Sequence, residues 1–210
     1  MKTDLVAFGD DLDDDSPAAV SVRIALSHQP TKAEALFLDP DEGGIPDHAA
    51  LDWLAGQGVT MGAITSPWAM AAAHVRFDGR GRYAPHLLGD LAFILPVIDR
   101  HGAADLCAWA PRTGETATRL GIGWMLGGDL IGRDIGDGVT VPPLRVFRTP
   151  LDWLRAHRNG IVILDPARAA VALAGIVIEA IDNNHANDLR RALRVPPPVV
   201  RVRYPERLAA

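Results

Sequence analysis

The last third of the chain alternates short apolar runs, rich in β-branched residues, with helix-like stretches of about 10 residues. Strands are predicted at four places, residues 144–147, 161–164, 176–181 and 199–204. Helices are predicted between them, at residues 150–158, 166–174 and 184–193. Strands that alternate with helices in this way favour crossover connections and therefore a parallel sheet.

Charged residues follow three of these predicted strands. Arg148 follows the first strand, Asp165 the second and Asp182 the third. Parallel α/β sheets bind their ligands at the carboxyl edge, so these positions are candidates for a site. Each aspartate also precedes a predicted helix, where it would serve equally well as an N-cap, and Thr149 precedes a helix in the same way. Both interpretations stay open.

The preceding region has the mixed pattern of an α+β fold. Asp47 is predicted to cap a short helix that ends at Leu54. Two apolar runs, residues 91–98 and 104–110, flank a short Gly-containing loop and predict an antiparallel β-hairpin. The glycine-rich segment 121–138 lacks the spacing of a phosphate-binding loop and is predicted to connect the two regions.

The expected fold class is therefore α/β, with two regions that differ in charge. Residues 1–143 form the α+β region with the hairpin and carry 10 Lys and Arg against 20 Asp and Glu. Residues 144–210 form the parallel strand–helix module and carry 11 Arg, no Lys and 6 acidic residues. A basic, arginine-only module favours a polyanionic partner, because a guanidinium donates two hydrogen bonds to one phosphate. A solvated basic face is the alternative.

The composition and the longest apolar runs argue against a disulfide-rich, a membrane-spanning and a secreted protein. Five of the six residues 10–15 are aspartates, which predicts an exposed acidic loop. The single Cys107 excludes an internal disulfide and is predicted to be a buried, inert thiol. No apolar run approaches the ~18 residues of a membrane span. With no signal-peptide pattern at the start of the sequence, we expect a cytoplasmic protein without a membrane partner.

Two segments of the module resemble the Toprim domain of bacterial-type primases and topoisomerases. In that family the first strand ends in a Glu-Gly pair followed by a helix Asp, and here Arg148, Thr149 and Asp152 stand at those positions. The third strand of the family ends in Asp-x-Asp, and here Asp182 and Asn184 stand at those positions. The hairpin before the module is similar to the β-rich subdomain of phage and plasmid primases, so the resemblance covers residues of about 90–195.

The departures from the Toprim pattern change the expected chemistry. The resemblance implies acid/base work for the glutamate and Mg²⁺ ligation for the two aspartates. Arg148 in place of the glutamate stays protonated and opposes a divalent cation. Asn184 offers a carbonyl oxygen but no charge. Any remaining metal site is therefore predicted at Asp182 and Asn184, with Asp165 as a weaker candidate, and no cofactor is expected unless the protein is an active Mg²⁺ enzyme.

We expect a primase-related protein of the phage or plasmid type that has a degraded Toprim-like site and is non-catalytic. It would bind DNA, RNA or a replication protein, and the sequence predicts no oligomeric state. The candidate nucleic-acid contacts are arginines of the basic module, Arg148, Arg155, Arg190, Arg191, Arg201 and Arg203. Two alternatives stay open: a Mg²⁺-dependent phosphodiester or nucleotidyl-transfer enzyme that uses Asp152, Asp165 and Asp182, and a small-molecule or protein-interaction domain.

Two further residues are singled out by their neighbours. His185 lies three residues from both Asp182 and Asp188, which permits a transition-metal site, although a hydrogen-bonded or exposed histidine fits the same pattern. Trp68 follows Pro67 in a loop and is the tryptophan expected to expose its ring, where it could stack on an unpaired base.

Overall fold

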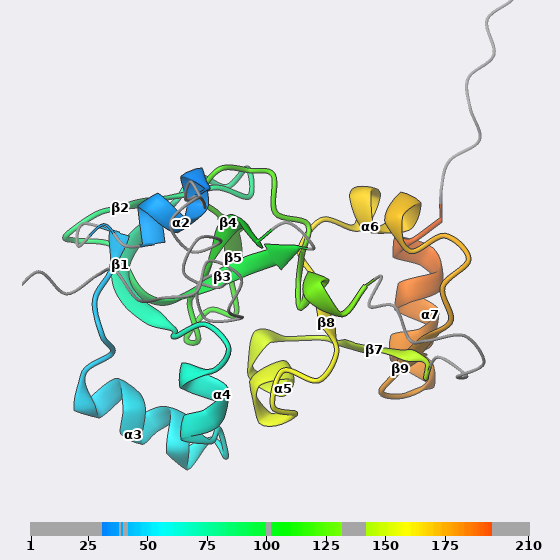
Figure 1. Cartoon of the computed structure of the whole chain (residues 1–210), viewed down its shortest axis with the longest axis horizontal. Coiled ribbons are helices and arrows are strands. Elements are labelled where there is room, and N and C mark those ends of the chain that lie inside the picture. The colour runs from blue at the N-terminus through cyan, green and yellow to red at the C-terminus, as the bar shows by residue number, and fades with distance from the viewer. Residues whose placement is uncertain (1–30, 38, 40–41, 100–101, 132–141, 195–210) are drawn as a thin grey trace, which may run out of the picture.

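The computed structural model describes residues 31–37, 39, 42–99, 102–131 and 142–194, and it contains two β-sheets with helices packed on them (Figure 1). Sheet A lies on one side of the molecule and sheet B on the other, with helix α5 (Pro150–Arg155) between them. The acidic run at 10–15 and the predicted strand at 199–204, which includes Arg201 and Arg203, lie outside the described residues.

Sheet A is antiparallel and contains the predicted hairpin. Its strands are β1 (Ala71–Phe77), β2 (Tyr83–Pro85), β3 (Asp90–Asp99), β4 (Gly102–Trp109) and β5 (Thr116–Thr118), in the order β2-β1-β3-β4-β5. β3 and β4 pair from Phe93 opposite Trp109 to Asp99 opposite Gly102. Residues 92–97 of β3 are all buried, because packed side chains cover both faces of the sheet at this strand.

Sheet B holds the predicted strand–helix module. Its strands are β6 (Met125–Leu126), β7 (Leu144–Phe147), β8 (Ile161–Ile163) and β9 (Ile178–Ala180), in the order β6-β8-β7-β9. β7 is parallel to both β8 and β9, whereas β6 is antiparallel to β8. The α/β class with an antiparallel hairpin is therefore confirmed, and the parallel sheet is corrected to a mixed one.

The correction comes from the glycine-rich segment, which was expected to be only a connecting loop. In its described part, this segment forms β6 and the short 3₁₀ helix η2 (Gly128–Leu130). Gly127 adopts a left-handed φ of 77°, and a Cβ at this position would collide with the carbonyl oxygen of Gly160. Glycine therefore lets this backbone pass close to the turn before β8.

The helices begin where the capping residues predict. α3 (His48–Gly56) begins after Asp47, whose carboxylate accepts from Ala50 N, and α5 begins after Thr149. α6 (Pro166–Ala172) begins after Asp165, and α7 (Asn183–Ala192) after Asp182. The other two described helices are short: α2 (Lys32–Phe37) and α4 (Met61–Thr65). Each cap satisfies backbone N–H groups that the first turn leaves without partners.

Three hydrophobic clusters hold the layers together. The largest lies between the sheets, where α3, α4 and α5 pack against β3, β4 and β8 through residues such as Leu54, Leu95 and Leu154. A second cluster covers the opposite face of sheet A, and a third packs α6 and α7 onto sheet B around Val146 and Leu189. Cys107 is buried in the first cluster, as predicted, and burial raises the pKa of its thiol above the ordinary value.

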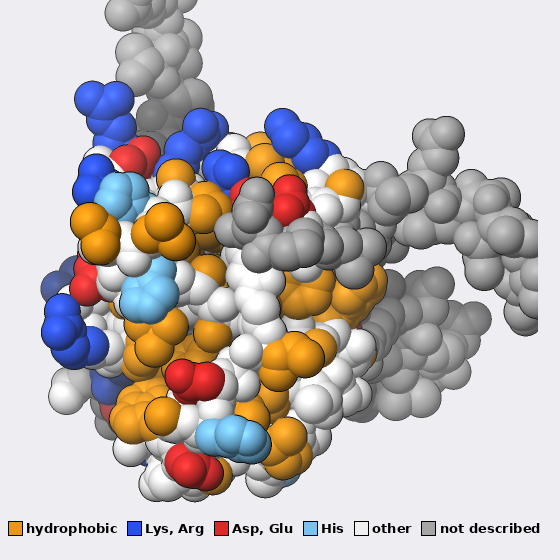
Figure 2. Space-filling view, turned by 90° about the vertical axis from the view of Figure 1, so that its left-hand side faces the viewer, with side chains coloured by type: hydrophobic (Ala, Val, Ile, Leu, Met, Phe, Trp, Pro, Cys, Tyr) orange, Lys and Arg blue, Asp and Glu red, His pale blue; other side chains and the backbone are white. Residues whose placement is uncertain are grey.

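The surface beside β1, β2 and α3 is shown in Figure 2. Hydrophobic side chains mix there with scattered acidic and histidine side chains, and Lys and Arg side chains lie along the upper and left borders. This view therefore shows no continuous basic face over the described residues of sheet A. No helix in the described parts of the chain is long and apolar enough to cross a membrane.

Candidate functional site

The carboxyl ends of β7 and β9 lie side by side, because these strands are parallel neighbours. Arg148 follows β7 and Asp182 follows β9, so the strand order brings these two predicted site residues to the same edge. Asp165 follows β8, on the other side of β7.

Arg148 and Asp182 form a two-point ion pair. The Arg148 Nη1 donates to Asp182 Oδ2 at 3.1 Å, and Nη2 donates to Oδ1 at 3.1 Å. The Arg148 side chain is 41% exposed and that of Asp182 is 45% exposed, so water screens the attraction and the pair contributes little to stability. Its consequence is chemical: the guanidinium engages both oxygens of the carboxylate that the Toprim resemblance places at a metal.

Asp182 also caps α7. Its Oδ1 accepts from His185 N at 2.7 Å. This backbone hydrogen bond, followed by the charge of Arg148, lowers the pKa of Asp182 below its ordinary value of 3.8. The carboxylate is therefore an anion at neutral pH with both its oxygens engaged by the protein itself.

The other two candidate acids serve as local helix-start residues. Asp165 accepts from Ala167 N at 3.0 Å and lies 3.4 Å from the Nε of Arg168. Asp152 accepts from the hydroxyl of Thr149 at 2.7 Å and lies 3.5 Å from Arg155. Within the described ranges, no group of three or more His, Cys, Asp and Glu side chains could hold a metal ion. The metal site at Asp182, Asn184 and Asp165 stays a prediction.

The structure describes four of the predicted nucleic-acid contacts: two meet at one carboxylate, a third lies on the same helix, and the fourth lies elsewhere. Arg148 Nη2 is 3.9 Å from Asp188, and Arg191 Nη2 donates to the same carboxylate at 3.0 Å. Arg190 donates to the neutral side chain of Asn187 in the same helix. Arg155 instead donates to the carbonyl of Gln57 at 2.6 Å, in the connection between α3 and α4. Arg148, Arg190 and Arg191 therefore belong to one surface at α7, which we call the α7 surface, and Arg155 does not.

His185 is hydrogen-bonded, as one of the interpretations predicted, but it is buried and not exposed. Only 4% of the residue is exposed, and its Nδ1 accepts from Ile181 N at 3.3 Å. This acceptor role requires a neutral ring. Burial and then the charge of Arg148 lower its pKa below 6.5, although Asp182 and Asp188 act in the opposite direction.

We expect this histidine to make the folded protein less stable as the pH falls from neutral through 6.5, the ordinary pKa of histidine. In this range the unfolded chain binds a proton that the folded chain does not, so the free energy of unfolding decreases until the folded ring is protonated as well. Urea denaturation at pH 7.5 and 5.5 measures the change. His185→Asn, which keeps an acceptor for Ile181 N, should lose less stability over this range than the wild type. An equal loss in both proteins would contradict the assignment, and His48→Asn at an exposed position is the control.

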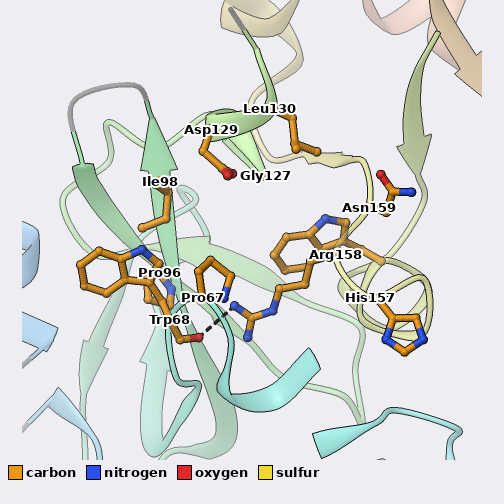
Figure 3. Close-up of a pocket in the computed structure, with 11 residues that line it drawn as sticks. Pro67, Trp68, Pro96, Ile98, Gly127, Asp129, Leu130, His157, Arg158 and Asn159 are labelled. Atoms are coloured by element: carbon orange, nitrogen blue, oxygen red, sulfur yellow. Dashed lines mark hydrogen bonds between the residues drawn. The ribbon is translucent and has the colours of Figure 1, made fainter. Parts of the chain in front are cut away.

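A second site, which the sequence did not predict, lies where the two sheets meet. It is a cavity of about 260 Å³ lined by β3, η2, the end of α5 and the connection between α4 and β1 (Figure 3). The Arg158 side chain forms part of the cavity wall. Its Nη1 donates to the carbonyl of Trp68 at 2.9 Å, and its Nη2 donates to the carbonyl of Ile64 at 3.4 Å. The Trp68 ring, expected to be exposed, is instead half-buried and lines this cavity.

Arg158 holds a position that few arginines occupy. Both His157 and Arg158 have a left-handed φ, of 53° and 60°, in the turn before β8. This turn points the guanidinium inward, where its central carbon lies 5.4 Å from the centroid of the Trp153 ring. Burial lowers the pKa of Arg158 to about 10, and the charge of Asp129 opposes this effect. The Asn159-Gly160 pair marks a turn in the sequence, but no sequence pattern indicates that Arg158 lines a cavity.

The structure thus offers two places for function. The edge of β7 and β9 carries an internally paired acid and base beside the α7 surface, and the junction of the sheets carries a cavity with a half-buried guanidinium. Comparisons with protein-family models, curated proteins and solved structures find no match to this chain.

Proposed function

We propose that the protein is a non-catalytic, primase-related domain of the phage or plasmid type that binds nucleic acid through the α7 surface. The observation that carries the non-catalytic part is the two-point pair of Arg148 with Asp182. A carboxylate bound on both oxygens by a permanent cation is a poor ligand for Mg²⁺, which takes one or two free carboxylates together with substrate phosphates. A catalytic Mg²⁺ at this edge would first have to displace Arg148.

The binding part rests on charge and on type of side chain. Residues 144–194 carry eight arginines and five acidic residues, a net charge of +3, whereas residues 1–143 carry a net charge of −10. Arg190 and Arg191 lie in the last turn of α7, and both are exposed. Their short hydrogen bonds to Asn187 and Asp188 are solvent-exposed, so phosphate oxygens can replace these partners at little cost. The alternative role of these arginines is to complement the dipole of the helix.

The proposal predicts salt-dependent binding that does not need Mg²⁺. Fluorescence anisotropy with labelled single- and double-stranded DNA, in Mg²⁺ and in EDTA, should show affinity at about 50 mM salt that falls steeply as salt rises. The double variant R190Q/R191Q should reduce the slope of log affinity against log salt by about 1.5, since each lost phosphate contact removes about 0.7–0.9. R112Q, which removes an exposed arginine of sheet A, is the matched control.

Three results would count against this function. An absence of DNA binding at about 50 mM salt would remove nucleic acid as the partner and leave a replication protein or another interaction as the role. An equal effect of R112Q would show that the α7 surface is not the contact. Binding or DNA cleavage that requires Mg²⁺ and is lost in Asp182→Ala would favour the enzyme alternative.

A further inference from the structure

The cavity between the sheets has walls of opposite hydrogen-bonding character. Arg158 supplies a guanidinium, which only donates, and Asp129 supplies a carboxylate, which accepts more than one hydrogen bond. Figure 3 shows the two groups on opposite sides of the cavity, with the carboxylate of Asp129 directed toward its centre. A donor on one wall and an acceptor on the opposite wall favour a ligand that has an acceptor at one edge and a donor at another.

The remaining walls combine apolar side chains with the polar side chains of His157 and Asn159. Trp68 and Trp153 line the cavity together with Pro67, Ile98 and Leu130. The indole N–H of Trp153 is already bonded to the carbonyl of Gly160 at 2.7 Å, so this residue offers its ring rather than a polar group. The volume of about 260 Å³ is below the ~300–1,000 Å³ of clefts that hold drug-sized ligands. A ligand of this site is therefore small, and aromatic walls favour one that is planar.

We propose that this cavity binds one nucleobase, either in a free nucleoside or as an unstacked base of a single strand. Nucleobases are planar and neutral, and they carry carbonyl or ring-nitrogen acceptors next to N–H donors. Arg158 would donate to an acceptor of the base, Asp129 would accept from an N–H, and Trp68 would provide the stacking surface. The single-strand form of the inference rests on the nucleic-acid function proposed above, whereas the free-nucleoside form does not.

Two features favour a base over a phosphate in this cavity. Two of the Arg158 nitrogens already donate to the carbonyls of Trp68 and Ile64, so the guanidinium cannot present its full fork to a phosphate. The carboxylate of Asp129 on the cavity wall only accepts hydrogen bonds, so it matches an N–H of a base and not an oxygen of a phosphate. The phosphates of a bound strand would remain outside the cavity.

Calorimetric titration of the full chain with guanosine, adenosine, cytidine and thymidine tests the inference without any phosphate. We expect at least one nucleoside to bind. Trp68→Ala should weaken its binding about tenfold, the size expected when one base loses its stacking partner. Asp129→Asn should also weaken it about tenfold, because the base N–H loses a charged acceptor. Trp68→Phe retains an aromatic ring and should stay within about threefold of the wild type. Asp90→Asn is the control for the loss of a carboxylate, and circular dichroism confirms that each variant is folded.

The outcomes separate this inference from the proposed function. A lack of binding by all four nucleosides at about 10 mM, or an affinity unchanged in folded Trp68→Ala or Asp129→Asn, would overturn the inference. Nucleoside binding without DNA binding would uphold the cavity and reject the α7 surface. If single-stranded DNA binds, the wild type should bind an oligonucleotide with abasic positions less tightly than the intact oligonucleotide, whereas Trp68→Ala should bind the two equally. Equal affinity of the wild type for the two oligonucleotides would overturn the single-strand form.

Discussion

Replacement of Asp105 by asparagine is expected to lower the free energy of unfolding by about 4 kcal/mol, one of the two largest losses that we predict for a single substitution. Asp105 is fully buried in β4. Its Oδ1 accepts from Leu106 N and Leu120 N at 2.8 and 2.7 Å, and its Oδ2 accepts from Ile122 N and Gly123 N at 2.8 and 2.7 Å.

The four hydrogen bonds explain the size of this effect. An asparagine side chain has one oxygen and one NH₂ group, so in either orientation the NH₂ meets two backbone N–H donors. Two buried donors then lose a charged acceptor, and hydrogen bonds of this kind contribute about 1.5–3 kcal/mol each. The segment at 120–123 would separate from β4, and with it the connection that leads to β6 in sheet B.

Urea denaturation of Asp105→Asn and of Asp90→Asn measures this difference. Asp90 is an exposed residue paired with Arg112, so its substitution should change the free energy of unfolding by less than about 1 kcal/mol. If Asp105→Asn stays within about 1 kcal/mol of the wild type, the four hydrogen bonds do not hold this segment in solution.

The sequence predicted local elements well, because their signals are local. The alternating apolar runs placed β7, β8 and β9, and the residues before α3, α5, α6 and α7 predicted their caps, whereas α2 and α4 were not predicted. The helices of sheet B end earlier than expected, for example α5 at Arg155 rather than residue 158, since the left-handed turn at His157 and Arg158 leads directly into β8, whereas α3 ends later, at Gly56 rather than Leu54. The N-cap interpretation of Asp165 and Asp182 is also confirmed.

Contacts distant in sequence could not be predicted in this way. Asp105 lies in an apolar run that suggested only a buried strand, and three of its four partners are backbone N–H groups 15–18 residues away, which no side-chain pattern marks. β6 is two residues long and exists only because β8 lies beside it. No single-chain pattern fixes strand order, so the contact between Arg148 and Asp182 became visible only once β7 and β9 were placed together.

The second large effect is expected at the ion pair of Glu42 and Arg119. The Nε of Arg119 lies 2.7 Å from Oε1 and 2.9 Å from Oε2 of Glu42. The Glu42 side chain is 6% exposed and that of Arg119 is 29% exposed, so the carboxylate is the more deeply buried partner. Arg119→Met leaves this carboxylate buried without its cation, which should cost about 3–5 kcal/mol.

The difference in burial predicts an asymmetry between the two partners. Glu42→Gln should cost less than Arg119→Met, because the Arg119 guanidinium can still reach water. The double variant E42L/R119M should recover most of the loss, since two apolar side chains can replace a buried ion pair at little cost. Urea denaturation of the two single variants and the double variant gives these values, and R112M at the exposed pair with Asp90 should cost less than about 1 kcal/mol. A double variant less stable than Arg119→Met alone would show that the apolar pair cannot pack between the connection from α2 to α3 and the end of β5.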